Sequence, residues 1–539
     1  MSFGIGYNSH VMYYNAQFSL SGSTGSNWTS VLTTKIVINT SSKVEAARGS
    51  GKRYTFSAAG PTWLPDNDIS DTLTELKDTA GTRTGWKYYE AATENTELYG
   101  ATGRLQSITT RVGVTQTLAY NASNQLTTVT DNYGRTLSFT YNAANATTGA
   151  NNIATVTDHV GNTVSYTYDA ANNLATVTYP GGGVKTYLYN EQAYTANTNL
   201  PNALTGITDE NGVRFATYKY DTQGRAISTE HAGGVEKYSL NYTSPYAQTI
   251  VTDPLGTART FNFQTILGVV KTTGVSQPCP TCGGTQSQAT TYDANGNVAS
   301  RTDFNGVQTT YGYDLARNLE TSRTEAVGSA NQRATSTTWH ATYRLPLTIT
   351  EPAAAATVGG IAGTKSTAFT YDTGGNLLQK DVIAPKNDGS SATELRTWKW
   401  TYNPLGQVLT ATDPLNQTTT TVYYPATDTA IPPKFTMGDA QTVSNALSHV
   451  ITFNEYDKNG RLTRMTDANG LITTMTYHPR GWLTSRAVNN GTTTESTAYS
   501  YDNVGQLTRV TLPDGSALNY AYDAAHRLVG MSDGSAVAR

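Results

Sequence analysis

Two cysteines that lie close together form the one compact group of residues that could do chemistry. Cys279 and Cys282 are the two cysteines of the chain, and Pro280 and Thr281 separate them. A Cys-x-x-Cys pair can be a redox centre, half of a zinc site or a disulfide. A zinc site needs two more ligands, which no nearby Cys or His pair supplies, and a redox centre needs a βαβ context. We therefore favour a structural loop, closed by a disulfide if the protein is exported, over free thiols and over metal or redox chemistry.

The seven histidines form no recognisable metal or catalytic group. No two of them lie within four residues of each other, and the chain has no His-Glu-x-x-His sequence. It has no Gly-x-Ser-x-Gly sequence either, and Gly49-Ser50-Gly51-Lys52 lacks the spacing of a phosphate-binding loop. We therefore expect no catalytic residue, no metal site and no cofactor, and we predict that the protein is not an enzyme.

The aspartates are numerous enough to suggest paired-carboxylate catalysis, but their spacing favours a structural role. Asp293, Asp303 and Asp314 lie 10 and 11 residues apart. The first two begin Asp-x-x-Gly sequences that end at Gly296 and Gly306. In a type I turn, Asp at the first position caps backbone N–H groups and Gly at the fourth lets the chain leave with positive φ. The spacing therefore predicts regularly placed turns.

The runs between these turns have the pattern of strands. Val307, Thr309, Tyr311 and Tyr313 alternate along one run, as expected for a half-buried strand. One unit is thus a β-hairpin of about 21 residues, and a fixed period of this length indicates a repeat protein. Further turns of the series begin at Asn121, Asp131, Asp169, Asp221, Asp372, Asn403, Asp457, Asp467, Asp502 and Asp523.

The composition also favours strands and turns, and it excludes some partners. Charged residues make up 14% of the chain, against about 25% in ordinary globular proteins. Tyr is abundant, with 35 residues, whereas Phe contributes 11. The net charge of −3 and the lack of a charge run do not suggest a nucleic-acid partner. The sequence has no apolar stretch long enough to span a membrane and no secretory signal at its start.

Two regions are predicted along the chain. Residues 1–110 are strand-like but off-period and contain Trp28, Trp63 and Trp86, which predicts a capping region for the open edge of the repeats. A short helix is expected near Ile69–Leu76. Residues 111–539 contain the regular repeats.

The number of repeats predicts an unusual shape. About 430 residues at roughly 10.5 per strand give on the order of 40 strands, and open sheets of more than about 10 strands must curl or split. Leu126 and Val129 are three residues apart, so we expect them on opposite faces of their strand. Mild hydrophobicity on both faces suits a wall better than a packed core. We therefore predict an all-β fold of antiparallel hairpins in a large curled, spiralled and hollow shell, with stacked sandwiches as the alternative.

The repeated Tyr-Asp-x-x-Gly sequence, as in Tyr292–Gly296, resembles the YD repeat of Rhs proteins, teneurins and insecticidal toxin complexes. The segments Tyr54–Phe56, Trp63–Asp66 and Gly85–Tyr88 also resemble the start of an Rhs shell. The resemblance implies a spiralled β shell around an empty chamber that holds a C-terminal toxin, which a core at the end of the shell cuts free. That core is not recognisable here, so self-cleavage is assigned to no residue.

On this basis we expect a non-enzymatic shell that encapsulates a toxin or effector domain and helps to deliver it. Its partner would be that domain, or a C-terminal core, in cis or in trans. We expect the protein to be secreted or at the cell surface, and the chain to be a fragment of a longer one. The alternative is a surface adhesin that binds carbohydrate or neighbouring cells. Tyrosine pairs such as Tyr499 and Tyr501 could bind sugars, although cross-strand packing is the favoured explanation. No motif supports a hydrolase.

Overall fold

The computed structural model describes residues 32, 34–49, 52–60, 62–143, 151–244, 247–279, 284–352, 363–386 and 393–534. Over these residues the chain forms 42 strands in one sheet, and each strand pairs antiparallel with the next one along the chain. Helix is confined to short 3-10 turns, of which Gln192–Tyr194 and Ala232–Gly234 are fully described. The prediction of an all-β fold with about 40 strands is confirmed.

The strands follow one another along the whole described chain. The first fourteen are β1 (Lys35–Ile38), β2 (Lys43–Ala47), β3 (Arg53–Ala59), β4 (Thr62–Pro65), β5 (Thr72–Lys77), β6 (Arg83–Glu90), β7 (Asn95–Gly100), β8 (Leu105–Thr109), β9 (Thr115–Tyr120), β10 (Leu126–Asp131), β11 (Thr136–Tyr141), β12 (Ile153–Asp158), β13 (Thr163–Tyr168) and β14 (Leu174–Thr178). The next fourteen are β15 (Val184–Tyr189), β16 (Leu204–Thr208), β17 (Arg214–Tyr220), β18 (Ala226–His231), β19 (Val235–Ser244), β20 (Gln248–Thr252), β21 (Ala258–Ile266), β22 (Val269–Cys279), β23 (Gly284–Tyr292), β24 (Val298–Thr302), β25 (Gln308–Asp314), β26 (Leu319–Glu325), β27 (Arg333–Trp339) and β28 (Pro346–Pro352). The last fourteen are β29 (Thr364–Tyr371), β30 (Leu377–Pro385), β31 (Thr393–Tyr402), β32 (Val408–Thr412), β33 (Thr418–Tyr423), β34 (Ala440–Ser444), β35 (Val450–Tyr456), β36 (Leu462–Thr466), β37 (Ile472–Tyr477), β38 (Leu483–Asn489), β39 (Thr494–Tyr501), β40 (Leu507–Thr511), β41 (Ala517–Tyr522) and β42 (Leu528–Asp533).

Capped turns connect the strands as the aspartate spacing predicts. The Oδ1 atom of Asp293 accepts the backbone N–H groups of Asn295 and Asn297, each at 2.9 Å. Gly296 donates its N–H to the Asp293 carbonyl at 3.0 Å and has a φ of 74°. Gly306, in the next turn, has a φ of 80°. The repeat thus has two turns. We call the one after Tyr-Asp the YD turn, including its Tyr-Asn and Tyr-His forms, and the other the mid-repeat turn.

A tyrosine at the end of a strand, in most cases directly before a YD turn, ties that strand to the preceding one. Tyr522 donates its hydroxyl hydrogen to the carbonyl of Leu507 at 3.0 Å, across the strand pair β40–β41. Burial raises the pKa of Tyr120 to about 12, so its hydroxyl remains a proton donor. We call these bonds tyrosine staples. Their donors are Tyr120, Tyr141, Tyr168, Tyr189, Tyr220, Tyr242, Tyr292, Tyr313, Tyr371, Tyr402, Tyr423, Tyr456, Tyr477, Tyr501 and Tyr522.

A β-bulge after each YD turn corrects one prediction about the faces of the sheet. Leu126 pairs with Tyr120, and Val129 pairs with Leu118, with a register shift that leaves Thr127 as the extra residue. The two partners are two residues apart, so they share a face, and Leu126 and Val129 therefore share it too. Both are buried, at 2% and 1% exposure. The predicted placement on opposite faces is wrong because simple alternation does not hold across a bulge.

The repeats are consequently two-faced. One face, which we call the apolar face, contains Leu, Val and Tyr side chains such as Val129, Val156 and Tyr166. Residues one position away, such as Thr155 and Thr157, point to the opposite hydroxyl face. Threonine pairs lie there at 2.6–2.9 Å between hydroxyl oxygens: Thr109–Thr115, Thr140–Thr155, Thr157–Thr163, Thr167–Thr176, Thr401–Thr410 and Thr412–Thr418.

The N-terminal strands contain the best-packed core. Trp63 and Trp86 are 6% and 0% exposed, and their rings meet edge-on at 5.4 Å between centroids. Trp28 lies outside the described residues. The helix predicted near Ile69–Leu76 is wrong: β5 forms there, because Leu73 is needed in the core of the sheet at 3% exposure. The boundary predicted after residue 110 falls in the turn between β8 and β9, where the sheet continues unbroken, so the division into two regions stays a prediction.

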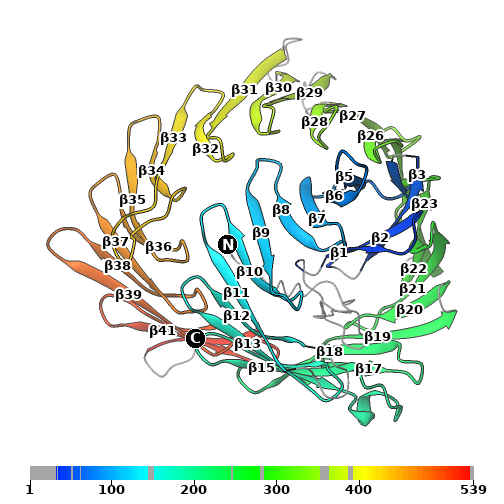
Figure 1. The fold of residues 1–539 in the computed structure, drawn as a ribbon, viewed down its shortest axis with the longest axis horizontal. Helices are drawn as coiled ribbons and strands as arrows, with labels where there is room; N and C mark the ends of the chain where they lie inside the picture. The colour runs from blue at the N-terminus through cyan, green and yellow to red at the C-terminus, as the bar shows by residue number, and fades with distance from the viewer. Residues whose placement is uncertain are drawn as a thin grey trace.

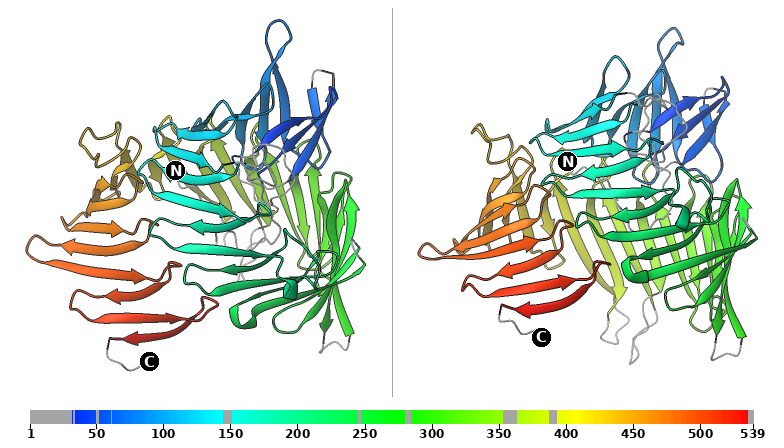
Figure 2. Two further views of the ribbon diagram at one scale, coloured as in Figure 1. Left: turned by 60° about the horizontal axis from the view of Figure 1, so that its bottom comes forward. Right: turned by 90° about the horizontal axis from the view of Figure 1, so that it is seen from below.

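The sheet winds into a spiral (Figure 1). At its start, β1 turns back onto the segment before β8, where Lys35 bridges Arg104 and the Ile36 N–H donates to the Gly103 carbonyl at 2.9 Å. In Figure 2 the strands β9–β16, cyan to green, lie beside β37–β42, orange to red. We call β4–β17 the first winding and β25–β42 the second winding. This curled, spiralled architecture is the predicted one.

Candidate functional site

The seam between the windings is the main candidate site, because it joins turns that are far apart in the sequence. Arg111 donates from Nε to the Gly374 carbonyl at 3.0 Å. The N–H of Arg344 donates to Oε1 of Glu94 at 2.6 Å. Asn318 donates from Nδ2 to the backbone carbonyl at position 67, at 2.8 Å. These contacts connect residues about 250 to 260 positions apart. Between Glu94 and Arg344 the chain passes through β7–β27, which are 21 strands, so one winding takes about ten hairpins.

The seam continues along the later turns of both windings. His159 Nε2 lies 2.5 Å from the Lys458 carbonyl oxygen. The guanidinium of Arg480 lies 4.3 Å from the centre of the Tyr179 ring, a cation–π contact. The first winding contributes its mid-repeat turns to this seam, and the second contributes YD turns. Those of the second winding include the turns that begin at Asp314, Asp372, Asn403, Asp457, His478, Asp502 and Asp523.

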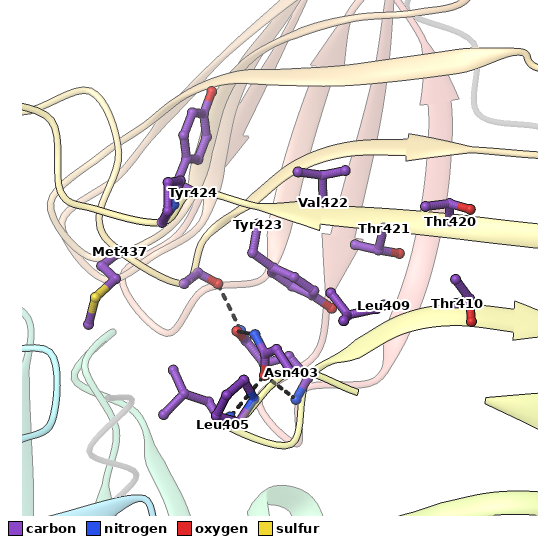
Figure 3. A pocket seen from close by; sticks show the side chains of 14 residues that line it. Asn403, Leu405, Leu409, Thr410, Thr420, Thr421, Val422, Tyr423, Tyr424 and Met437 are labelled. Carbon is purple, nitrogen blue, oxygen red and sulfur yellow. Dashed lines mark hydrogen bonds between the residues drawn. The ribbon is translucent and has the colours of Figure 1, made fainter. Parts of the chain in front are cut away.

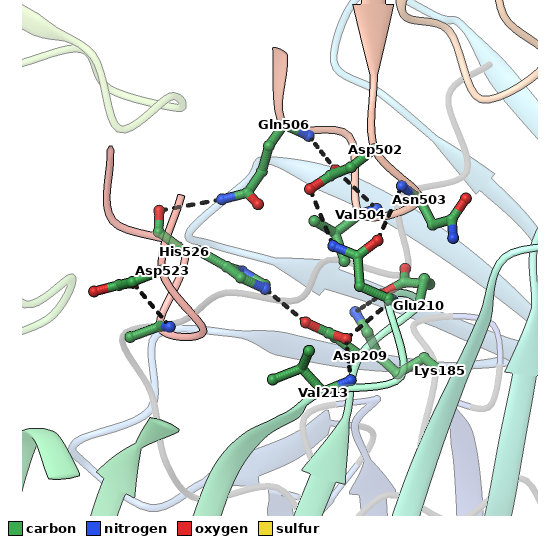
Figure 4. Close-up of polar contacts among 12 residues, drawn as sticks. Lys185, Asp209, Glu210, Val213, Asp502, Asn503, Val504, Gln506, Asp523 and His526 are labelled. Carbon is green, nitrogen blue, oxygen red and sulfur yellow. Dashed lines mark hydrogen bonds and ion pairs between the residues drawn. The ribbon is translucent and has the colours of Figure 1, made fainter. Parts of the chain in front are cut away.

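A group of polar residues, which we call the seam clasp, closes the last part of this seam (Figure 4). His526 Nε2 lies 2.8 Å from Oδ2 of Asp209, whose side chain is 3% exposed. The other oxygen of Asp209 accepts the N–H groups of Asn211 and Val213 at 3.0 and 2.9 Å. The ring of Phe215 stacks on His526 at 4.2 Å between centroids. Both carboxylate oxygens of Asp209 are thus engaged, which is typical of a structural clamp rather than of a general base.

Glu210 is the second buried carboxylate of the seam clasp, with a side chain that is 2% exposed. Arg480 Nη2 lies 3.0 Å from its Oε1, and Lys185 Nζ lies 3.7 Å from its Oε2. Asn211 Nδ2 donates to Oδ2 of Asp502 at 3.0 Å, from the first winding to the second. A buried carboxylate is costly unless it is paired. Arg480 and Lys185 supply that pairing, so the seam clasp holds the windings together electrostatically as well as by packing.

His478 adds a titratable group to the same seam. Its ring stacks on Trp482 at 4.6 Å between centroids, and its Nδ1 accepts the N–H of Arg480. Desolvation, followed by the positive charge of Arg480, holds the pKa of His478 below its usual value. A neutral imidazole therefore fits this position best.

A hollow of about 530 Å³ lies beside the YD turn at Asn403 (Figure 3). Leu405, Leu409 and Tyr423 are among the apolar residues that line it. Two of its amide side chains are already paired: Asn403 Nδ2 donates to Gln407 Oε1, and Gln407 Nε2 donates to the Gly438 carbonyl, each at 2.8 Å. A ligand site normally offers free polar groups that fix orientation. The hollow therefore has the character of a gap in packing.

The residues that the sequence singled out for chemistry have different outcomes. Cys279 ends β22 and is 7% exposed, whereas Cys282 lies outside the described residues. No cysteine in the described part of the chain is a free thiol, and the Cys279–Cys282 disulfide stays a prediction. Within the described ranges, no three His, Cys, Asp or Glu residues gather as a metal site would require.

Sequence reasoning missed the role of the histidines. His159, His340, His478 and His526 all lie at turns of the seam, far apart in the chain. One of them could have been noticed in the sequence, since His478 stands where the repeat usually has Asp. The pairing of His526 with Asp209, 317 residues away, has no local signal at all.

The repeats match a known family. The family model described as RHS Repeat matches residues 99–136, 148–184, 292–330, 456–494 and 501–538. The chain therefore contains RHS repeats. This confirms the resemblance seen in the Tyr-Asp-x-x-Gly sequences, because each matched segment contains at least two of the capped turns described above.

One solved structure shares the fold of this chain, and others match it at lower TM-scores. A TcdB2-TccC3-TEV crystal structure matches with a TM-score of 0.50 and 14% identity, over 92% of this chain and 27% of that chain. The TcdB2-TccC3 structure without its hypervariable C-terminal region matches with a TM-score of 0.45 and 13% identity, over 92% of this chain and 27% of that chain. The Photorhabdus luminescens Tc holotoxin pore matches with a TM-score of 0.46 and 12% identity, over 89% of this chain and 26% of that chain.

The solved chains are much longer than this chain. This chain spans about a quarter of the solved chains it matches, 27% in the first case, and the identity supports a shared fold only. No curated protein matches the sequence at a significant level. Among the described residues, no helix has the length and apolar character needed to cross a membrane.

Proposed function

We propose that this RHS-repeat sheet is a non-enzymatic shell that encloses a toxin or effector polypeptide and helps to deliver it. The observation that carries the proposal is the amount of surface left uncovered. The accessible area is 29005 Å², whereas a compact monomer of 57.8 kDa would have about 19,000 Å² by the usual scaling. A sheet of this size that does not collapse onto itself has large faces available to another polypeptide.

The apolar face of the second winding is the surface that such a cargo would contact. In the first winding this face is covered, as Val129, Val156 and Val177 show at 1%, 6% and 4% exposure. Their counterparts after the YD turns of the second winding, such as Met465 and Val510, are only half-buried. An extended or partly folded polypeptide could cover them, because apolar area removed from water stabilises the complex.

Two further points support the proposal. The YD repeats resemble those of toxin-delivery shells, and the fold is shared with the TcdB2-TccC3 chain. We propose that the cargo, or a core domain that retains it, is supplied in cis or in trans. The shell would act outside the cell that makes it, as a secreted or surface-bound protein.

The adhesin alternative has less support. It relied on tyrosine pairs as a carbohydrate surface, but Tyr313, Tyr501 and Tyr522 direct their hydroxyl groups to backbone carbonyls as staples. These hydroxyls are therefore committed to the repeat itself. We do not propose carbohydrate as a ligand.

Neighbouring residues on β37 allow the proposal to be tested. Met475 lies on the apolar face and is half-buried, whereas Thr474 lies on the hydroxyl face and is exposed. Each would be changed to Cys in a chain with Cys279→Ser and Cys282→Ser, and labelled with a maleimide, with and without a polypeptide cargo fused after Arg539. We expect the cargo to slow labelling at position 475 at least several-fold and to leave position 474 unchanged. Equal labelling rates with and without cargo at both positions would contradict an enclosed cargo.

A further inference from the structure

An asparagine beside the seam clasp stands where a spontaneous reaction would change the charge of the seam. Asn211 is exposed and is followed by Gly212. Both ends of its side-chain amide reach the second winding: Nδ2 donates to Oδ2 of Asp502 at 3.0 Å, and Oδ1 accepts the N–H of Asn503 at 3.2 Å. We propose that Asn211 is a deamidation site under the control of the seam. The closed seam suppresses the reaction, and the reacted side chain prevents an opened seam from closing again.

The proposal goes beyond cargo enclosure, because it concerns the seam whether or not a cargo is present. Asparagine followed by glycine favours this reaction, since glycine has no side chain to hinder the attack of its backbone nitrogen. The Gly212 nitrogen bonds to the side-chain carbonyl carbon of Asn211, and the amide nitrogen leaves as ammonia with the proton of the Gly212 N–H. Water then opens the cyclic imide, which gives aspartate or isoaspartate at position 211. Water is the one further reactant, and Asn211 is exposed to it.

The closed seam opposes the first step of this reaction. The side chain of Asn211 has to turn its carbonyl carbon toward the Gly212 nitrogen, which would break both hydrogen bonds to the second winding. The turn itself is not special: the Gly212 N–H donates to the Asp209 carbonyl at 3.0 Å, and the Gly306 N–H donates to the Asp303 carbonyl at 3.1 Å. The seam contacts therefore distinguish Asn211 from asparagines in other turns of the same shape.

The product would carry a negative charge toward another carboxylate. A carboxylate at position 211 would replace the amide group that now lies 3.0 Å from Oδ2 of Asp502. Like charges at such a distance repel each other. Arg480 and Lys185, the Arg and Lys of the seam clasp, already pair with the buried Glu210. The new charge would thus lack a cation, and an opened seam would not regain its bonds at this turn.

Two other asparagines are internal controls for the first half of the proposal. Asn305 and Asn469 hold the same position in turns of the same kind, also before glycine. Within the described ranges, neither side chain has a hydrogen-bond partner. The chain of 539 residues is kept in mildly alkaline buffer, and deamidation at the three positions is followed by peptide mapping with mass spectrometry. We expect Asn211 to react several-fold more slowly than Asn305 and Asn469.

A weakened seam should remove this protection. Arg480→Met breaks the ion pair with Glu210 and leaves the turn of Asn211 intact. In this variant we expect the rate at Asn211 to rise toward that at Asn305, while the rate at Asn305 stays unchanged. Equal rates at Asn211 and Asn305 in the parent chain, or a rate at Asn211 that Arg480→Met does not change, would overturn the control by the seam.

A second pair of variants tests the effect of the product. Asn211→Asp supplies the new carboxylate directly, and Asn305→Asp is its matched control in a turn outside the described seam. Hydrogen exchange of the turn that begins at Asp502 should become several-fold faster with Asn211→Asp and stay unchanged with Asn305→Asp, because local opening sets the exchange rate. Unchanged exchange with Asn211→Asp would overturn the proposal that the reacted side chain keeps the seam open.

Discussion

The two windings are built from the same repeat but are packed differently. Leu126 follows a YD turn in the first winding and is 2% exposed, whereas Leu462 follows one in the second winding and is half-buried. The carbonyls of both accept a tyrosine staple, from Tyr141 and Tyr477. The repeat therefore fixes the backbone in both windings, whereas the burial of its apolar face depends on what else lies against that face. The difference shows that hydrogen bonds hold the wall together and that the apolar face is available for contacts.

The largest expected effect is a loss of stability, and it tests directly whether the two windings are packed differently. Leu126→Ala should lower the free energy of unfolding by about 2–5 kcal/mol, because it leaves a cavity in a packed region. Leu462→Ala should cost less than half of this, since its side chain already contacts solvent. Urea unfolding of both variants measures the difference. Equal losses would mean that the second winding is as well packed as the first.

The next effect concerns the seam that joins the windings. Arg480→Met leaves the buried carboxylate of Glu210 with Lys185 as its remaining partner, so we expect a loss of about 1.5–3 kcal/mol in the local stability of the seam. Hydrogen exchange of the turns at Asp209 and His478 measures it. Arg486→Met is the control, because Arg486 is exposed on β38. A similar effect of both variants would remove the electrostatic role of the seam clasp.

The stability of the seam between the windings should also depend on pH, through His478. The folded-state pKa of His478 is lowered, so the stability that its neutral form provides is complete above the unfolded-state value of about 6.5. This contribution is lost as the pH falls below that value toward the folded-state pKa. We expect the protection factors of the seam amides, corrected for the pH dependence of intrinsic exchange, to fall in this range, with a flatter profile for His478→Gln. A seam that becomes more stable on acidification of the parent protein would contradict the assignment.

The smallest expected effect is that of a single staple. Tyr313→Phe should lower stability by about 0.5–1.5 kcal/mol, because one hydrogen bond is lost while the ring stays. Tyr311→Phe on the same strand is the matched control, since Tyr311 does not donate to a staple. Thermal unfolding of the two variants should therefore rank Tyr313→Phe as the less stable. No difference between them would show that the rings, not the hydroxyls, join the repeats.

Local patterns in the sequence were sufficient to predict the strands and turns. The Asp-x-x-Gly spacing specifies a capped turn within five residues, as Asp293 and Gly296 show, and alternation specifies the strand between turns. The bulge at Thr127 was not predictable from alternation, because one inserted residue restores the face of Leu126 without changing the composition. The helix expected near Ile69–Leu76 failed because tertiary packing of Leu73 overrides the local helix signal.

The seam could not be predicted at all from local patterns. Its contacts depend on how many strands complete one winding, which follows from the small twist and curl between neighbouring strands. An error of one hairpin in that number would place His526 against a different turn from Asp209. The order of the strands along the sheet was therefore accessible from the sequence, whereas the pairing of the windings was not.

Small-angle X-ray scattering of the monodisperse chain tests the central claim, an open wound sheet with uncovered faces, most directly. A compact protein of 539 residues would have a radius of gyration near 24 Å, about the value from the usual scaling. The spiral predicts a clearly larger radius and a distance distribution of a hollow body. A radius close to the compact value, with the distribution of a filled globule, would contradict the account, because the repeats would then be stacked into sandwiches without room for another polypeptide.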